Sequence, residues 1–354
     1  MARIDLDLAH AYKANPQRDE DYALLPLKMT FDDGGAYALL GPSGCGKTTL
    51  LNIVSGLVRP SQGGVKFDGV EVTGHTPQQR NIAQVFQFPV IYDTMTVAEN
   101  LAFPLRNRGA SAEYIEQRVG RIAEMLELTG QLDMRAAGLA ADAKQKISLG
   151  RGLVREDVSA VLFDEPLTVI DPHLKWQLRR KLKQIHHELK LTLLYVTHDQ
   201  VEALTFADQV VVMTRGRAVQ VGSASDLFER PQHTFVGHFI GSPGMNFLPA
   251  ALFPRSLAQQ MPAGATTLGV RPEYVTLAGP GAAGTLPAVI TQAQDIGTYW
   301  LVTATVAGSD TPVRARLSPQ ATIPKVGEAV ALGLLGSHTC FYRDDLLIGQ
   351  ETAR

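Results

Sequence analysis

The first part of the chain contains short apolar runs whose length is typical of buried strands. They are Ala36 to Leu40, Ile82 to Phe86, Ser159 to Phe163 and Leu191 to Val196. Residues Arg3 to Leu8 instead alternate between apolar and polar side chains, which predicts a half-buried strand at the beginning of the chain. We therefore expect a sheet that contains several buried strands.

Segments with helical character lie between these strands. Thr49 to Val54 is expected to be a helix, and Thr96 with Glu99 has the spacing of a capping box, which predicts the start of another. Ala112 to Leu128 and Pro172 to Lys190 carry apolar residues at intervals of three and four, as one face of a helix does. The mixture of strands and helices indicates an α/β domain.

The texture of the sequence changes near residue 239. The last part is rich in Ala, Gly and Pro and contains short alternating strands such as Tyr299 to Val306 and Val313 to Leu317. We expect an α/β domain over residues 1–238, with a helical subdomain at about 93–156, and an all-β domain, a small barrel, over 239–354.

Composition narrows the class of protein. A chain of 354 residues suggests two domains, and its net charge of −2 argues against a nucleic-acid-binding protein, which needs cations to neutralise phosphates. Its two cysteines, Cys45 and Cys340, form no disulfide framework and fit a reducing compartment. Neither an apolar signal core nor a run as long as a membrane span is present, so we expect a soluble chain that reaches a membrane only through a partner.

The phosphate-binding pattern G-x-x-x-x-G-K-[ST] occupies residues 41–48, between a predicted strand and a predicted helix. Glycines let the backbone N–H groups turn toward phosphate oxygens, and the start of a helix adds partial positive charge at the same place. Lys47 would reach the β- and γ-phosphates, and the Thr48 hydroxyl would hold Mg²⁺. The alternative is a glycine-rich turn with a chance Lys-Thr pair, but both flanking segments favour a nucleotide site.

Chemically capable side chains follow the other predicted strands. Asp164 is suited to holding Mg²⁺, and Glu165 to polarising the water that attacks the γ-phosphate. Gln87 could touch both the metal and that water, and His198 could face the γ-phosphate. Tyr12, at the end of the first strand, offers a ring on which adenine could stack.

Each of these residues also has an ordinary structural interpretation. The two carboxylates could simply cap a strand, Tyr12 could be a half-buried aromatic residue, Gln87 a surface residue and His198 a structural histidine. The predicted helix from Pro172 to Lys190 also carries a basic cluster, which we interpret as a solvent-exposed face. The cluster consists of Arg179, Arg180, Lys181 and Lys183.

Several segments together resemble one family. They are GPSGCGKTT (Gly41 to Thr49), Arg80 to Leu101, VLFDEPL (Val161 to Leu167), LYVTHDQVEAL (Leu194 to Leu204), FIGSPGMNFL (Phe239 to Leu248) and GVRPE (Gly269 to Glu273). The chain resembles the ATPase subunits of ABC transporters of the maltose-type sugar-importer class, and the resemblance covers essentially its whole length. It implies a P-loop NTPase domain of the ABC type, followed by an OB-like or TOBE-like regulatory domain.

The resemblance also implies roles for particular residues. Glu165 is the catalytic carboxylate, with His198, Gln87 and Lys47 also catalytic, and Asp171 lies in a loop that crosses a dimer interface. Thr48, Gln87 and Asp164 contact Mg²⁺. The residues expected to bind ATP are Tyr12, Gly41, Ser43, Gly44, Cys45, Gly46, Lys47, Thr48, Thr49, Gln87 and Asp164.

One segment departs from the family pattern. Members carry L-S-G-G-Q at the start of a helix that closes over the ATP of the other subunit, and here the aligned residues are Leu139-Ala140-Ala141-Asp142-Ala143. Loss of the serine hydroxyl removes about 1.5–3 kcal/mol if it bonded a phosphate. A carboxylate at about 4 Å from a phosphate charge costs about 4 kcal/mol at an effective dielectric constant of about 20. Lys144 and Lys146 could offset part of that cost.

The altered segment makes a homodimer awkward, because both ATP sites would have a poor lid. We therefore expect a heterodimer with a second ATPase subunit that carries an intact signature, although a homodimer is possible. The degenerate lid is similar to that of one of the two ATPase subunits of bacterial glycerol importers. The further partners implied are membrane permease subunits and an extracytoplasmic solute-binding protein, with no nucleic acid, and the location implied is the cytoplasmic face of the inner membrane.

Three functions compete at this point. The first is an ATPase subunit that powers import of glycerol or a related polyol, sugar or sugar-phosphate. The second is a non-hydrolysing subunit that binds ATP as a scaffold or regulator, which the damaged lid favours and the intact Glu165 and His198 oppose. The third is a soluble ABC-type ATPase of translation or repair, which the single nucleotide domain and the regulatory-type C-terminal domain oppose.

Overall fold

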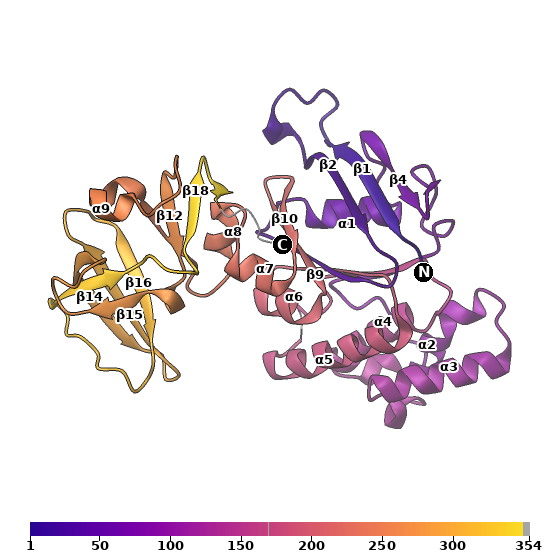
Figure 1. The fold of residues 1–354 in the computed structure, drawn as a ribbon. Helices are drawn as coiled ribbons and strands as arrows, with labels where there is room; N and C mark the ends of the chain where they lie inside the picture. The colour runs from indigo at the N-terminus through magenta and orange to yellow at the C-terminus, as the bar shows by residue number, and fades with distance from the viewer. Residues whose placement is uncertain (169, 350–354) are drawn as a thin grey trace. The chain divides into compact units, whose positions relative to one another are not determined.

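The computed structural model describes residues 1–168 and 170–349, which fall into two compact units. The first comprises residues 1–224 and the second residues from 225 onward (Figure 1). This division lies before the boundary at 238/239 that the change of sequence texture suggests. The helices α7 (Ala224–Glu229) and α8 (Thr234–Phe239) precede that change in texture but belong with the second unit.

A six-stranded sheet forms the centre of the first unit. Its strands, in spatial order, are β10 (Arg217–Gly222), β9 (Gln209–Thr214), β3 (Ala36–Leu40), β8 (Leu193–Thr197), β7 (Ala160–Asp164) and β6 (Ile82–Val85). The strands from β9 to β6 pair in parallel, whereas β10 pairs antiparallel with β9 at one edge. The four predicted apolar runs supply β3, β6, β7 and β8, and burial of a parallel sheet on both faces explains why they are continuously apolar.

A second sheet of the first unit is antiparallel. It consists, in order, of β2 (Leu24–Phe31), β1 (Ile4–His10), β4 (Gln62–Phe67) and β5 (Val70–Glu71). Strand β2 was not predicted from the sequence, and Pro26 interrupts its pattern. Because β2 lies at the edge of the sheet and Pro26 is exposed, the missing N–H costs no ladder hydrogen bond inside the sheet.

Helices cover the central sheet and form a subdomain beside it (Figure 1). They are α1 (Lys47–Ser55), α2 (Val97–Arg106), α3 (Ala112–Met125), α4 (Ala141–Leu153), α5 (Pro172–Leu189) and α6 (Gln200–Phe206). Thr96 and Glu99 form the predicted capping box at the start of α2. Helices α2, α3 and α4 contact one another, which confirms a helical subdomain between β6 and β7.

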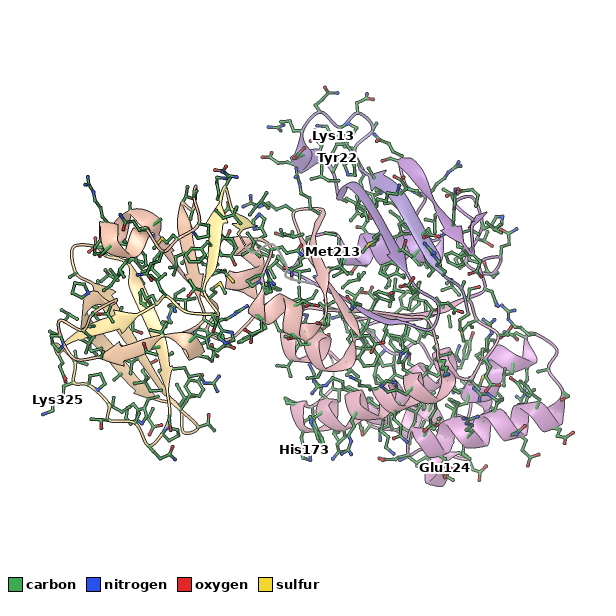
Figure 2. The ribbon with its side chains drawn as sticks, viewed as in Figure 1. Lys13, Tyr22, Glu124, His173, Met213 and Lys325 are labelled. Atoms are coloured by element: carbon green, nitrogen blue, oxygen red, sulfur yellow. The ribbon has the colours of Figure 1, made fainter. Side chains whose placement is uncertain are left out.

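The main core of the first unit is shared by α1 and both sheets. Leu6 of β1, Leu39 of β3 and Leu50 of α1 belong to one buried cluster, so α1 lies between the two sheets. Side chains fill the space between the elements of this unit (Figure 2). Complete burial of an apolar side chain of this size contributes about 1.5–3 kcal/mol, which fixes α1 and the loop before it in place.

The second unit is built mainly from two antiparallel sheets, which confirms the expected all-β domain. One sheet has the order β11 (Asn246–Pro249), β12 (Thr267–Val270), β18 (Cys340–Arg343) and β19 (Leu346–Ile348). The other has the order β13 (Thr276–Ala278), β17 (Ala329–Gly333), β14 (Leu286–Asp295), β15 (Trp300–Val306) and β16 (Pro312–Leu317). A short helix, α9 (Arg255–Ala258), follows β11.

A buried arginine explains why α7 and α8 belong to the second unit. Arg271, which is 1 % exposed, donates to the carbonyl oxygens of Phe228 at 2.9 Å and Gly237 at 3.2 Å, and also to that of Ile240. Its guanidinium also lies 4.2 Å from the centre of the Phe228 ring. A buried charge is tolerated only with such partners, so these contacts tie both helices to the end of β12.

Candidate active site

The parallel strands bring the predicted site residues together at the carboxyl ends of the strands of the central sheet. Strands β3, β8, β7 and β6 are neighbours that run in the same direction. Gly41 follows β3, His198 follows β8, Asp164 ends β7, and Gln87 comes two residues after β6. Ligands of open α/β sheets bind outside the carboxyl ends of the strands, which is where these four residues lie.

The loop between β3 and α1 has the backbone that a phosphate cradle requires. Gly44 has φ +77° and Gly46 has φ +103°, the left-handed region that favours glycine. Gly46 is also the N-cap of α1, and it offers no side chain to bond the first N–H groups of the helix. A Cβ at Gly44 would meet no atom within 4 Å, so there is open space beside the loop. The free N–H groups and the start of a helix make this a suitable place for an anion.

Lys47 lies across this loop. Its side chain is buried, and Nζ donates to the carbonyl oxygen of Gly41 at 2.7 Å and to that of Pro42 at 3.0 Å. The Cys45 thiol is also buried, and burial raises its pKa, so the thiol stays protonated and packs as part of the core. These two hydrogen bonds hold the ammonium group of Lys47, and its positive charge, at the phosphate loop.

Two predicted metal-contacting residues meet directly. The Thr48 hydroxyl donates to Oδ1 of Asp164 at 3.3 Å, which joins the start of α1 to the end of β7. Burial raises the pKa of Asp164, and the charge of Glu165 adds to that rise, whereas the Thr48 hydrogen bond and the charge of Lys47 oppose it. An additional cation beside this carboxylate would favour its ionised form.

Glu165 is held in an uncommon backbone conformation. Its φ is +47°, which costs a non-glycine residue about 1–3 kcal/mol. The backbone N–H donates to the carbonyl oxygen of Val196 at 3.0 Å, so the neighbouring strand helps to hold this conformation. Oε2 lies 3.0 Å from Nδ1 of His198 and accepts from the Thr168 hydroxyl at 3.1 Å. The side chains of His198 and Thr168 thus orient the carboxylate of Glu165.

Tyr12 lies beside the phosphate loop but remains open to solvent. Its side chain is 69 % exposed, its hydroxyl is 3.3 Å from Oγ1 of Thr49, and its ring meets the buried His10 ring edge-on at 4.5 Å. Burial lowers the pKa of His10, so the imidazole ring that contacts Tyr12 is neutral. An exposed ring with one edge fixed is a suitable platform for a flat base. Ser43 is exposed at the tip of the loop.

Comparison with known proteins agrees with this geometry. Residues 24–168 match the family described as ABC transporter, and residues 268–341 match the TOBE domain. The sn-glycerol-3-phosphate import ATP-binding protein UgpC of Salmonella typhi is 43 % identical over 267 residues, which are 71 % of this chain and 75 % of that protein. UgpC of Paraburkholderia xenovorans is 37 % identical over 345 residues, 91 % and 93 % of the two chains.

The chain belongs to the ATP-binding proteins of ABC transporters.

Other relatives of this ABC ATPase extend the comparison. The trehalose import ATP-binding protein SugC of Mycobacterium tuberculosis is 42 % identical over 280 residues, 79 % of this chain and 70 % of that protein. The solved structure of cbiO1 from Clostridium perfringens, part of the ABC transporter complex cbiONQ, has a TM-score of 0.58 at 25 % identity. The match covers 64 % of this chain and 90 % of the cbiO1 chain. The expected family and fold are confirmed, and the chain is an ATPase that binds ATP.

The signature segment of this ABC ATPase begins α4 without a side-chain cap. Ala140 is the N-cap residue and makes no side-chain hydrogen bond, whereas Asp142 places a carboxylate in the first turn. The two lysines that could have offset part of this charge pair with other carboxylates. Lys144 lies 3.1 Å from Asp93, and Lys146 lies 3.8 Å from Glu127. The negative charge of Asp142 is therefore not neutralised by either lysine.

Two contacts of the site were not expected from the sequence. Thr168 holds Glu165, and the fully buried Gln145 of α4 donates to the carbonyl oxygen of Pro166 at 2.5 Å. The second contact joins the signature helix to the segment that follows Glu165. No pattern in the sequence marks these residues, because each contact depends on how distant segments pack. Asp171 caps α5 by accepting from the His173 N–H at 2.9 Å.

The site fits a magnesium nucleotide. Mg²⁺ prefers oxygen ligands and is commonly held by one or two side chains together with substrate phosphates, and Thr48 with Asp164 provides such a pair of oxygens. Within residues 1–168 and 170–349, no group of three or more His, Cys, Asp or Glu residues could hold a metal by itself. No helix in these ranges is long and apolar enough to cross a membrane.

Proposed function

We propose that this chain is the ATP-hydrolysing subunit of an importer for sn-glycerol-3-phosphate, glycerol or a related polyol or sugar. The observation that carries the proposal is that the phosphate loop, Asp164, Glu165 and His198 lie together at the carboxyl ends of the parallel strands. The substrate class follows from relatives that are named as import proteins for sn-glycerol-3-phosphate and trehalose. The partners would be membrane permease subunits and an extracytoplasmic solute-binding protein, with this chain on the cytoplasmic face of the inner membrane.

Each side chain then has a chemical task. Tyr12 stacks on adenine, and the N–H groups of residues 43–49 with Lys47 bind the phosphates. Glu165 accepts a hydrogen bond from the attacking water and orients it in line with the γ-phosphate. His198, already 3.0 Å from that carboxylate, contacts the γ-phosphate and keeps Glu165 in place. Thr48, Gln87 and Asp164 would hold Mg²⁺, which neutralises charge on the phosphates when bound.

We further propose that this chain works in a heterodimer with a second ATPase subunit. The chain carries every residue predicted for the catalytic side of its own site, whereas the lid that it offers to a partner lacks a capping hydroxyl and carries Asp142. In a heterodimer, an intact signature of the partner would close over this chain's ATP. The site formed by the partner's phosphate loop and Ala140–Ala143 of this chain would be the slow one.

A non-hydrolysing scaffold subunit is the second candidate, and the lid is the observation that favours it. Ala140 and Asp142 would weaken closure over any ATP that this chain covers. The oriented Glu165 and the nearby His198 oppose this candidate, since a scaffold needs neither. Hydrolysis by the chain's own site distinguishes the two functions.

Repair of the lid is expected to raise the ATP turnover of the chain alone. Changing Ala140→Ser and Asp142→Gly restores a phosphate-bonding hydroxyl and removes a like charge, so we expect at least a tenfold increase in the rate. Asp142→Asn tests the charge separately at nearly constant size. The measurement is phosphate release at saturating ATP, with thermal melting as a check because a glycine in the first turn destabilises a helix by up to about 1 kcal/mol.

Glu113→Gln provides a matched control for the repair. It also removes a carboxylate from the first turn of a helix, α3, but outside the signature segment. We expect no change in turnover from this variant. An unchanged rate in the repaired variant, with folding intact, would show that Ala140 and Asp142 do not limit the lid.

A further inference from the structure

A groove beside α5 is separate from the strand ends that form the nucleotide site. It has a volume of about 620 Å³ and lies between α5 and Thr205 of α6. The α5 residues that border it include Trp176, Arg180, Lys183 and His187. These positions recur at intervals of three and four, which brings their side chains to one side of the helix. Three members of the basic cluster that the sequence placed on a solvated face, Arg179, Arg180 and Lys183, therefore border a concave surface.

The cations that border the groove have no carboxylate partner among the described residues. In the part of the chain that the structure describes, none of Arg179, Arg180 and Lys183 has a carboxylate within ion-pair distance. Lys183 donates from Nζ to the carbonyl oxygen of Thr205 at 3.0 Å, and Arg180 lies 5.8 Å from the centre of the Trp176 ring. Both contacts leave the positive charges available to an incoming anion.

Other lysines of α5 form ion pairs with carboxylates, so the cations without such a partner are gathered at the groove. Lys175 lies 3.6 Å from Glu202, and Lys181 lies 3.4 Å from Glu127. The whole chain has a net charge of −2, so a cluster of unneutralised cations is not a general property of its surface. We take this segregation as the sign of a surface that receives a negatively charged partner.

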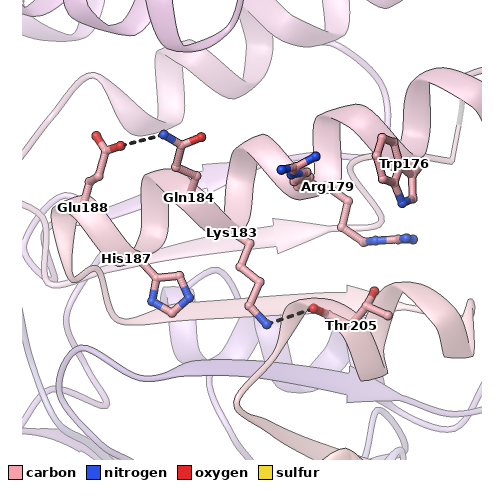
Figure 3. Close-up of a pocket in the computed structure, with 8 residues that line it drawn as sticks. Trp176, Arg179, Lys183, Gln184, His187, Glu188 and Thr205 are labelled. Carbon is pink, nitrogen blue, oxygen red and sulfur yellow. Dashed lines mark hydrogen bonds between the residues drawn. The ribbon is translucent and has the colours of Figure 1, made fainter.

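The one carboxylate among the residues that border the groove is engaged elsewhere. Glu188 accepts from Nε2 of Gln184 at 3.0 Å and pairs with Arg121 at 3.8 Å. Figure 3 shows Glu188 and Gln184 on the side of α5 opposite to Lys183, which extends toward Thr205. Among the described residues, the carboxylate of Glu188 is therefore occupied by Gln184 and Arg121, and no ion pair joins it to the cations that border the groove.

We propose that the groove docks an extended acidic segment of a partner protein. Along α5, the groove residues from Trp176 to His187 form a row about 16 Å long at the rise of an α-helix. An extended chain of about five residues has the same length. Trp176 is 55 % exposed and would receive an apolar side chain at one end, while Arg179, Arg180 and Lys183 receive carboxylates. A concave groove suits an inserted chain better than a flat lipid surface, and the net charge of −2 opposes nucleic acid.

Tryptophan fluorescence gives a direct test on the full chain. The sequence has two tryptophans, so Trp300→Phe leaves Trp176 as the only one. The probe is a blocked peptide of five glutamates and one leucine, titrated at low and at physiological salt. We expect a saturable change in Trp176 emission that weakens as salt rises. Changing Arg179, Arg180 and Lys183 together to glutamine should weaken binding about tenfold or more, since several exposed pairs are lost.

A second triple variant separates the groove from overall charge. Arg18→Gln, Lys28→Gln and Lys181→Gln remove the same number of positive charges outside the row and should leave binding unchanged. An equal loss in both triple variants, or no titration of Trp176, would overturn the proposal. Tighter binding to phosphatidylserine vesicles or to single-stranded RNA than to the peptide would also overturn it. Equal melting temperatures confirm that the variants fold.

Discussion

Replacing Glu165 by glutamine is expected to lower ATP turnover at this chain's own site at least 100-fold. The amide keeps the size of the side chain but cannot act as a base or carry the charge that orients the attacking water, and such groups contribute about 10²–10⁴-fold. His198 and Thr168 remain able to contact the amide oxygen, so the local packing is preserved. Phosphate release in the assembled ATPase measures the effect.

Binding measurements separate lost chemistry from lost structure in this variant. A fluorescent ATP analogue should bind Glu165→Gln as tightly as the unchanged chain, because the phosphate loop is intact. Glu116→Gln, at an exposed position of α3, is the matched control and should hydrolyse normally. Turnover within twofold of the unchanged assembly would support the scaffold function and contradict the role given to Glu165.

Replacing Lys47 by methionine is expected to weaken ATP binding about 10- to 100-fold. The methionine retains an apolar stem in a buried position but removes the charge at the phosphate loop. A hydrogen bond to a charged group contributes about 1.5–3 kcal/mol, which corresponds to this range of affinity. Equilibrium titration with a fluorescent ATP analogue measures the loss.

The same change leaves the Gly41 and Pro42 carbonyl oxygens without their present donor, so stability must be followed. Lys28→Met, at a lysine whose side chain is 84 % exposed, serves as the control and should bind ATP normally. If Lys47→Met binds ATP as well as the control does, the ammonium does not contact the phosphates and the nucleotide site must be assigned differently.

Much of the site could be predicted because its residues follow recognisable strands. The apolar runs of β3, β6, β7 and β8 are continuous since both faces of the sheet are buried, and the phosphate loop, Gln87, Asp164 and His198 lie at or within two residues of their ends. What the sequence could not supply was the order of the strands. The Thr48–Asp164 and Glu165–His198 contacts exist because β8 lies between β3 and β7, a neighbour relation that periodicity does not encode.

Other features were missed for physical reasons of the same kind. Strand β2 was not predicted. It contains Pro26, and a proline argues against a strand unless the strand is known to lie at the edge of a sheet. Lys144 could have offset part of the charge of Asp142, but residues two apart on a helix do not face each other, and Lys144 pairs with Asp93. The basic cluster of α5 was treated as one solvated face, whereas the structure separates Lys181, which is paired, from the cations of the groove.

The measurement that tests the central claim most directly is ATP hydrolysis by the purified chain, first alone and then with a second ATPase subunit that carries an intact L-S-G-G-Q signature. The proposed function predicts near-zero turnover alone and a large gain on mixing, and the gain should disappear when this chain carries Glu165→Gln. Comparable turnover by the chain alone would mean that Leu139 to Ala143 is a working lid in a homodimer, and the asymmetric heterodimer would be contradicted.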